Sequence, residues 1–190
     1  MDLSFLKGTR IVVADIETTS TSVQKTFVRE FGIAEYKDGL FVRSNAALFS
    51  GGVCEEGALR VHGISDQSVA GKPLFASKAK TAGTFLSDAI VMGHNMYKFD
   101  LPIISRILMS QGIRIRGDGP DGRIRVIDTL LEARKRLNLP SNTLQNICSV
   151  FGIEHGGHRA AGDCVSCWNV FLKIVEMTGE TDLSKYIILY

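Results

Sequence analysis

The strongest constraint on the fold of this 190-residue chain is a set of acidic residues that adjoin apolar runs. They are Asp15, Glu17, Asp100 and Asp163, and His158 lies shortly before the last of them. An unpaired carboxylate beside a buried segment is costly unless a positive charge compensates it. Two divalent cations would balance four carboxylates, so the sequence predicts a fold that brings these residues together around two metal ions.

A phosphodiester held between two such cations is the substrate class that fits this arrangement, which indicates nucleic-acid hydrolysis. The chain has 22 Lys and Arg residues against 20 Asp and Glu residues, a net charge of +2. With the four acids neutralised by metal, 22 basic residues face 16 acidic ones, and the net charge becomes +6. This modest positive balance suits a polyanionic partner.

Length and composition predict one globular domain over residues 1–190. The first ten residues lack an apolar stretch of signal-peptide length, and no run approaches the length of a membrane span. We therefore expect an intracellular protein, cytoplasmic or nuclear, with no membrane partner. The four cysteines are expected to be buried reduced thiols, since no matching zinc ligands accompany them: Cys54, Cys148, Cys164 and Cys167.

The pattern of apolar residues predicts a mixed sheet. Residues 10–14 read as a strand buried on both faces, and residues 27–36 and 41–49 form a hairpin around a Lys-Asp-Gly-Leu turn, which gives a three-strand antiparallel meander. Further strands are expected at 90–92 and 125–127, and helices at 73–89, 101–111, 129–137, 143–151 and 160–177. Residues 50–71 and 117–122 read as turns and loop. The predicted class is therefore α/β, with a five-stranded mixed sheet and helices on both faces.

Each acid also has a simpler interpretation. Asp15 and Glu17 share one face of a strand, where one metal could bridge them, but a lone Asp-x-Glu also fits a strand end open to solvent. Asp100 precedes Leu-Pro and could be nothing more than a helix N-cap. A helix N-cap is also a sufficient role for Asp128. Asp163 falls outside the polar stripe of the last helix, on a line with no basic residue, which favours a metal partner over a salt bridge.

Other polar residues have open roles. His158 stands in a glycine-bearing loop, where a general base for water would be placed, although a loop histidine without function is common. His94 and Asn95 follow a predicted strand at the carboxyl edge of the sheet, and Asn95 could hold backbone or substrate. Residues 106–136 contain eight basic residues and four acidic ones. The basic residues form either a solvated face or a surface that binds phosphates along a nucleic-acid strand. They are Arg106, Arg114, Arg116, Arg123, Arg125, Arg134, Lys135 and Arg136.

Three ordered motifs carry a resemblance to a known family. Asp-Ile-Glu-Thr-Thr at 15–19, His-Asn-Met-Tyr-Lys-Phe-Asp at 94–100 and His-Arg-Ala-Ala-Gly-Asp at 158–163 resemble those of the DEDDh 3′-to-5′ exonucleases, the DnaQ-like group. The segments 61–65, 127–129 and 143–144 also look like the family's connecting segments, so the likeness covers nearly the whole chain. The His-Asn-x-x-x-Phe-Asp-x-Pro pattern looks closer to the three-prime repair exonucleases of eukaryotes than to bacterial proofreading subunits.

The resemblance implies a ribonuclease-H-like fold and a site for two Mg²⁺ ions, for which Mn²⁺ can substitute. Asp15, Glu17, Asp100 and Asp163 would hold the metals, and His158 would deprotonate the attacking water. The family's substrate-binding positions map to Thr18, Thr19, His62, Ile64 and Asn95, and the backbone at the first two would hold the terminal 3′-hydroxyl.

The expected activity is a metal-dependent 3′-to-5′ exonuclease that releases nucleoside 5′-monophosphates from single-stranded or frayed DNA ends. RNA-trimming exoribonuclease activity is the first alternative, because two-metal hydrolysis does not itself depend on the sugar. A non-catalytic nucleic-acid-binding protein on the same fold is the second. The expected partner is a single-stranded 3′ end, and a homodimer is left open.

Overall fold

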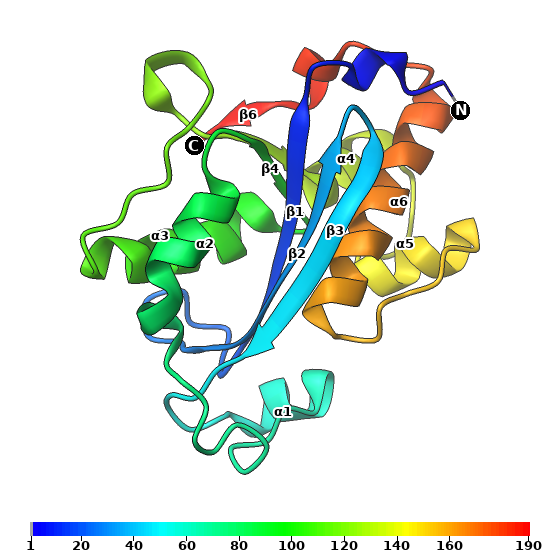
Figure 1. Cartoon of the computed structure of the whole chain (residues 1–190). Helices are drawn as coiled ribbons and strands as arrows, with labels where there is room; N and C mark the ends of the chain where they lie inside the picture. Colours follow the sequence, from blue (N-terminus) through cyan, green and yellow to red (C-terminus); the bar gives the residue numbers. More distant parts are fainter. Residues whose placement is uncertain (1) are drawn as a thin grey trace.

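A mixed sheet flanked by two helical layers forms the frame of the chain (Figure 1). The computed structural model describes residues 2–190, and within them the sheet has six strands in the order β3-β2-β1-β4-β5-β6. β1, β4 and β5 run parallel, and the other neighbours pair antiparallel. The strands are β1 (Arg10–Thr18), β2 (Val28–Lys37), β3 (Leu40–Leu48), β4 (Ile90–Gly93), β5 (Arg125–Asp128) and β6 (Ile188–Leu189).

The predicted α/β class and meander are confirmed, with two differences. Asp38 and Gly39 both have positive φ, 54° and 78°, which is the geometry of a two-residue hairpin between β2 and β3. β1 continues to Thr18, four residues beyond the predicted end, because Asp15 and Glu17 remain paired with β2. The sheet has six strands instead of the predicted five, since β6 contains only two residues and owes its conformation to pairing with β5.

Six α-helices lie within the described residues: α1 (Glu56–His62), α2 (Ala79–Leu86), α3 (Leu101–Ser110), α4 (Thr129–Arg136), α5 (Leu144–Phe151) and α6 (Ala160–Thr178). α1 lies in a stretch that the sequence predicted to be turns. The helix predicted at 73–89 divides into a 3₁₀ turn, Phe75–Lys78, and α2. Further single turns are Ser4–Leu6, Pro120–Gly122 and Leu183–Tyr186, and a π turn spans Met96–Asp100. Between residues 2 and 190, no helix has the length and apolar character needed to cross a membrane.

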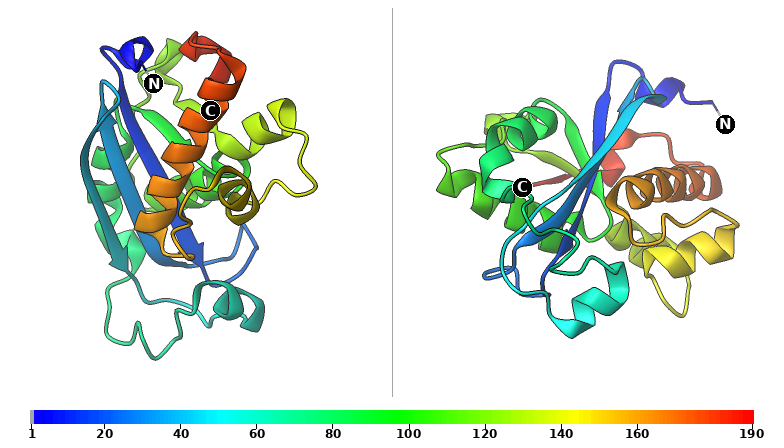
Figure 2. Two further views of the ribbon diagram at one scale, coloured as in Figure 1. Left: turned by 90° about the vertical axis from the view of Figure 1, so that its right-hand side faces the viewer. Right: turned by 60° about the horizontal axis from the view of Figure 1, so that its bottom comes forward.

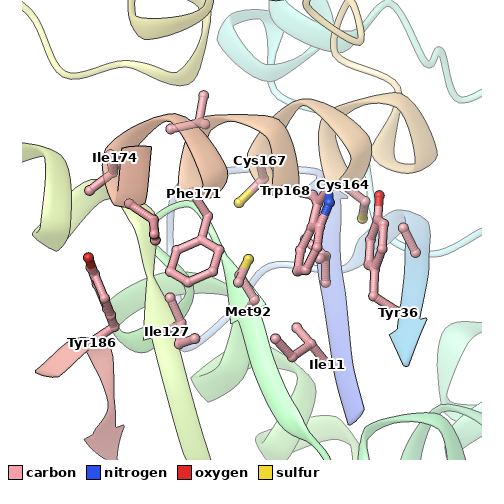
Figure 3. Packing of buried hydrophobic residues seen from close by; sticks show 14 of the residues in the cluster. Ile11, Tyr36, Met92, Ile127, Cys164, Cys167, Trp168, Phe171, Ile174 and Tyr186 are labelled. Carbon is pink, nitrogen blue, oxygen red and sulfur yellow. The ribbon is translucent and has the colours of Figure 1, made fainter. Parts of the chain in front are cut away.

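The sheet separates two hydrophobic cores. α2 and α3 cover one face, where β1 contributes Val12 and Ala14, and α5 and α6 cover the other, where it contributes Ile11 and Val13 (Figures 1 and 2). α6 packs on its face through aromatic side chains. Trp168 stacks on Tyr36 of β2 with ring centroids 3.9 Å apart and an interplanar angle of 11° (Figure 3). The core thus fixes the position of α6 along β1 and β2.

The first turn of α6 lies unusually close to β2. A β-carbon added to Gly32 would lie 2.4 Å from the carbonyl carbon of Ala160, so only glycine permits this approach. Glu30, two residues earlier in β2, accepts hydrogen bonds from the backbone N–H of Ala160 at 3.0 Å and from the Arg159 guanidinium at 2.8 Å. Gly32 pairs with Asp15, so these contacts bring the start of α6 opposite the end of β1.

The substitution Gly32→Ala should destabilise the fold by about 1–3 kcal/mol, because α6 or β2 must shift to accept the methyl group. Gly57→Ala is the matched control, since Gly57 lies in α1 with no other atoms within 4 Å of an added β-carbon. The control should be neutral or stabilising by up to about 1 kcal/mol. Urea unfolding of both variants measures the difference. A Gly32→Ala protein as stable as the control would show that the close approach is not required.

Candidate active site

A cleft of about 720 Å³ opens at the carboxyl ends of β1, β4 and β5. Its walls come from the end of β1, the turn 94–100, one side of α4, residues 140–145 and the segment 155–163. α1 lies beyond the end of β1 (Figures 1 and 2), and Val61 of α1 lines the cleft. Ligand sites in open sheets with parallel strands commonly occur at this edge.

Three of the predicted acids meet in this cleft. Asp15 and Glu17 lie on the same face of β1, and Asp163 reaches them from the first turn of α6. Each offers a ligand atom, and these atoms all lie within 4.8 Å of one another. The sequence-based expectation that these residues come together agrees with this geometry.

Asp100 enters the same cleft from the π turn that precedes α3. Its carboxylate makes no capping bond to α3, which rules out the N-cap interpretation. Instead, its Oδ1 accepts a hydrogen bond from the backbone N–H of Ile16 at 3.1 Å. This bond holds the Asp100 carboxylate against β1 at Ile16, the residue between Asp15 and Glu17. The second carboxylate oxygen of Asp100 is available to a ligand.

Within residues 2–190, none of the four carboxylates forms an ion pair with a Lys or Arg side chain. Burial raises the pKa of Asp15 well above its usual range, and the neighbouring Asp100 and Glu17 charges raise it further. Burial and the Asp163 charge raise the pKa of Glu17 to about 8, and burial raises that of Asp100 to about 7. The pKa of Asp163 is also raised, because burial outweighs the favourable influence of two histidines.

The donor set fits divalent cations. Oδ1 of Asp163 is buried and makes no hydrogen bond within the described residues, and Nε2 of His155 faces it at 3.5 Å, so its lone pairs remain available to a ligand in the cleft. Carboxylate oxygens are the ligands that Mg²⁺ and Mn²⁺ prefer, and a cation would remove the mutual repulsion of the four groups. Asp15, Glu17, Asp100 and Asp163 are therefore suited to hold such ions.

Two histidines border the acids. His158 has a left-handed backbone (φ 57°), and its ring centroid is 5.1 Å from that of His155. Nε2 of His155 lies 3.5 Å from Oδ1 of Asp163, and its Nδ1 accepts a hydrogen bond from the N–H of Gly157. Sequence reasoning missed His155, although the pattern His-Gly-Gly-His shows both residues.

Asp128 fixes the turn that presents Asp100. The predicted N-cap is confirmed, since its Oδ1 accepts from the N–H groups of Leu130 and Leu131. The same carboxylate also accepts from the N–H groups of Asn95 and Tyr97, both at 3.0 Å. The side chain of Asn95 lines the cleft, and its role as a substrate ligand stays a prediction.

Protein groups contact both ring nitrogens of His94. They lie 3.0 Å from the Thr129 hydroxyl and 2.9 Å from the Asn142 carbonyl oxygen. These contacts connect the turn after β4 to α4 and to the loop before α5. Burial lowers the pKa of His94, which keeps the ring neutral in this position.

The other predicted substrate positions lie behind the cleft surface. Nδ1 of His62 accepts from the N–H of Ile64, so Nε2 carries the proton and donates to the Thr18 carbonyl at 3.1 Å. The N–H of Thr19 donates to Phe27, and its carbonyl accepts from Glu55. These four residues therefore hold α1 and the following loop against the end of β1, and direct substrate contact by Thr18, Thr19, His62 and Ile64 stays a prediction.

Comparisons with known proteins identify the family of the chain. The RNase_T family, described as exonuclease, matches residues 12–171. DNA polymerase III subunit epsilon of Buchnera aphidicola (subsp. Acyrthosiphon pisum) is 29% identical over 91% of this chain and 74% of its own length. The corresponding subunit of Aquifex aeolicus is 27% identical over 91% of this chain and 83% of its own length. The chain therefore belongs to the exonuclease family.

Solved structures show the same fold. E. coli exonuclease I, in a crystal structure with a dT13 oligonucleotide, superposes with a TM-score of 0.76 at 18% identity over 88% of this chain. This chain spans about two fifths of the exonuclease I chain (41%). Together with the fold, the family match makes the chain a DnaQ-like 3′–5′ exonuclease and so a hydrolase. A closer likeness to the three-prime repair exonucleases stays a prediction.

Without metal, the stability of the protein should fall as pH rises from about 4 to about 8. The acids titrate near pH 4 in the unfolded chain, whereas Glu17 and Asp100 have pKa values of about 8 and about 7 in the fold. The folded state thus binds more protons in this range, and the stability that protonation supplies is lost as pH passes the folded pKa values.

Added Mg²⁺ should reverse this loss, and more strongly at pH 8 than at pH 6, because the metal competes with protons for the same oxygens. At 100 times its dissociation constant, the cation should raise the melting temperature by roughly 5–10 °C at pH 8. Thermal melts with chelator and with Mg²⁺ at both pH values measure the effect, with Asp15→Asn as the control variant. An equal shift at both pH values, or one that Asp15→Asn retains, would contradict the proposed ligands.

Proposed function

We propose that the chain hydrolyses single-stranded DNA from its 3′ end and releases nucleoside 5′-monophosphates, with two Mg²⁺ ions that Mn²⁺ can replace. The observation that carries the proposal is a cluster of four carboxylates, two buried and two half-buried, beside a histidine pair. Within residues 2–190, none of the four forms an ion pair with Lys or Arg. Structural acids are normally paired, since an uncompensated buried charge is costly. A site that keeps four such groups is suited to bind cations together with an anionic substrate.

In this proposal Asp15, Glu17, Asp100 and Asp163 hold the two ions. When bound, divalent cations would polarise the scissile phosphate and make a nearby water molecule more acidic. The Gly32–Ala160 approach and the Ile16–Asp100 hydrogen bond keep the carboxylates in place before any ligand arrives. Preorganised ligands of this kind lower the cost of binding.

His158 is the proposed general base, which accepts the proton of the attacking water. Both ring nitrogens of His155 already face partners, namely the Gly157 N–H and the Asp163 carboxylate. Within residues 2–190, the His158 ring makes no hydrogen bond, and it lines the cleft. Its nitrogen is therefore available for proton transfer.

The end of the cleft that α1 bounds through Val61, called the closed end, supports cleavage from a terminus. α1 and its loop stand beyond β1, and His62 and Glu55 bind the backbone of Thr18 and Thr19. In this proposal, a strand that enters from the opposite side meets this wall with its 3′ end beside the carboxylates. The backbone near Thr18 and Thr19 is then the proposed site for the terminal 3′-hydroxyl, with Asn95 beside the substrate.

DNA is the proposed substrate because the curated relatives are named as DNA polymerase subunits. The dT13 complex of exonuclease I shows that this fold accepts single-stranded DNA in that protein. An intracellular location, cytoplasmic or nuclear, remains part of the proposal, as does a single domain over the chain.

End-labelled single-stranded DNA should shorten from its 3′ end in Mg²⁺ or Mn²⁺ and not in chelator. RNA of the same sequence should be degraded more slowly, and a 3′-phosphate should slow the reaction strongly because it blocks the site of the free hydroxyl. Gel electrophoresis and chromatography of the products measure this, with Asp15→Asn expected to lose several orders of magnitude in rate. Internal cuts, 3′-phosphate products or full turnover in chelator would refute the proposal.

His158→Ala should lower turnover by roughly two to four orders of magnitude while metal and DNA still bind. His155→Ala is the matched comparison and should retain a much larger rate, because its nitrogens are not free to take a proton. Asp163→Asn should instead weaken metal binding, since a charged ligand is removed. Calorimetric metal titration and steady-state rates separate these outcomes. If His155→Ala is as inactive as His158→Ala, or if His158→Ala loses metal, the assignment of the base is wrong.

A further inference from the structure

The structure resolves the basic stretch 106–136 into residues with different partners. Arg106 donates to the carbonyl groups of Val23 and Thr26. The other engaged members form ion pairs: Arg116 with Asp88, Arg125 with Asp118 and Arg136 with Glu132. These side chains are occupied by protein groups, so the stretch as a whole is not one phosphate-binding surface.

Arg134 differs from these paired residues, and it differs from the unpaired Arg114, Arg123 and Lys135 in lining the cleft. It is exposed, makes no ion pair within residues 2–190, and is the only Lys or Arg among the described residues that line the cleft. Leu130, one turn earlier on α4, lines the cleft as well, so this side of the helix faces the site. Lys135 is the next residue, about 100° further around the helix, and does not line the cleft.

The charge of Arg134 reaches the interior of the site. It contributes to the lowered pKa of His94, although burial of that ring is the larger cause. The guanidinium thus acts on the same region as the carboxylates without pairing with any of them. An unpaired cation at the rim of an acidic cleft is suited to a mobile anion rather than to a fixed protein partner.

The sheet order places Arg134 opposite the closed end. Thr18 and α1 lie at the end of β1, whereas α4 follows β5, two strands away in the order β1-β4-β5. Neighbouring strands are about 4.8 Å apart, so the two sides are separated by about 10 Å. A DNA strand whose 3′ end lies at the β1 side must leave the cleft past α4.

We propose that Arg134 binds a backbone phosphate on the 5′ side of the scissile phosphate and so selects strands longer than a dinucleotide. The proposal rests on the function proposed above, because it requires that the cleft bind a 3′ end. Guanidinium groups suit phosphate oxygens, which they contact through charged hydrogen bonds that carry no base specificity. Arg134 would therefore supply affinity for the strand without touching the reacting atoms.

The test compares Arg134→Gln with the matched control Lys135→Gln, which changes the net charge equally on the same helix. One substrate is a deoxydinucleotide with a single phosphodiester and no terminal phosphate, and the other is a deoxyhexanucleotide of the same 3′ sequence. Arg134→Gln should raise KM for the hexanucleotide roughly tenfold with little change in kcat. It should leave kcat/KM for the dinucleotide unchanged, since that substrate lacks the upstream phosphate.

Salt dependence supplies a second measurement that does not depend on the slow dinucleotide reaction. The slope of log KM for the hexanucleotide against log salt concentration should fall by about 0.7 in Arg134→Gln, as expected for the loss of one phosphate contact to a single strand. Lys135→Gln should keep the wild-type KM and slope. Thermal melts should show that both variants remain folded.

The outcomes separate this inference from the function on which it rests. Equal KM values and salt slopes for the two variants, with an active wild type, would overturn the role of Arg134 alone. An equal loss on both substrates would place Arg134 at the scissile phosphate and would also overturn it. A wild-type protein that hydrolyses neither substrate would refute the proposed function itself.

Discussion

The mutual repulsion of four carboxylates is the interaction around which this structure is built; Asp100 and Asp163 are buried, and Asp15 and Glu17 are half-buried. Asp15, Glu17 and Asp163 bring ligand atoms within 4.8 Å of one another, and burial with like charge raises their pKa values. Such a cluster opposes folding at neutral pH, so contacts elsewhere must hold it together. The Trp168–Tyr36 stack and the Glu30 hydrogen bond do this by fixing α6 on β2, although Glu30 pairs with Glu17 across the strands and its charge adds to the repulsion.

These supports belong to regular elements rather than to loops. Asp15 and Glu17 pair with β2 at the end of β1, whose earlier residues Ile11–Val13 also pair with β4, and Asp163 stands in a helix whose first turn is fixed by Glu30. Asp100 follows a turn that Asp128 holds through the N–H groups of Asn95 and Tyr97. A site that must keep like charges close needs this rigidity, because flexible elements would let the carboxylates move apart. Catalysis that depends on fixed metal positions gains from the same constraint.

The sequence predicted the members of the site whose positions follow from local periodicity. Strand alternation places Asp15 and Glu17 on one face, and helical spacing places Asp163 off the polar stripe. Glu30 and the selection of Arg134 from eight basic residues depend on tertiary contacts that no local pattern contains, whereas the pattern His-Gly-Gly-His shows His155 but not its contact with Asp163. α1 and β6 were missed for a related reason. Each is short and takes its conformation from neighbours, α1 through His62 and Thr18 and β6 through β5.

The charge distribution also implies an order of binding. The cleft has four carboxylates and, among the described residues, a single Arg or Lys at its rim, so without cations it repels a nucleic-acid strand. Two divalent cations would neutralise the acids, and the net charge of the chain would change from +2 to +6. Arg134 would then act on an approaching phosphate without opposition from the acids. Under the proposed function, the same carboxylates that make the metal-free fold less stable would also make substrate binding depend on metal, so the anionic strand would be bound only together with the ions.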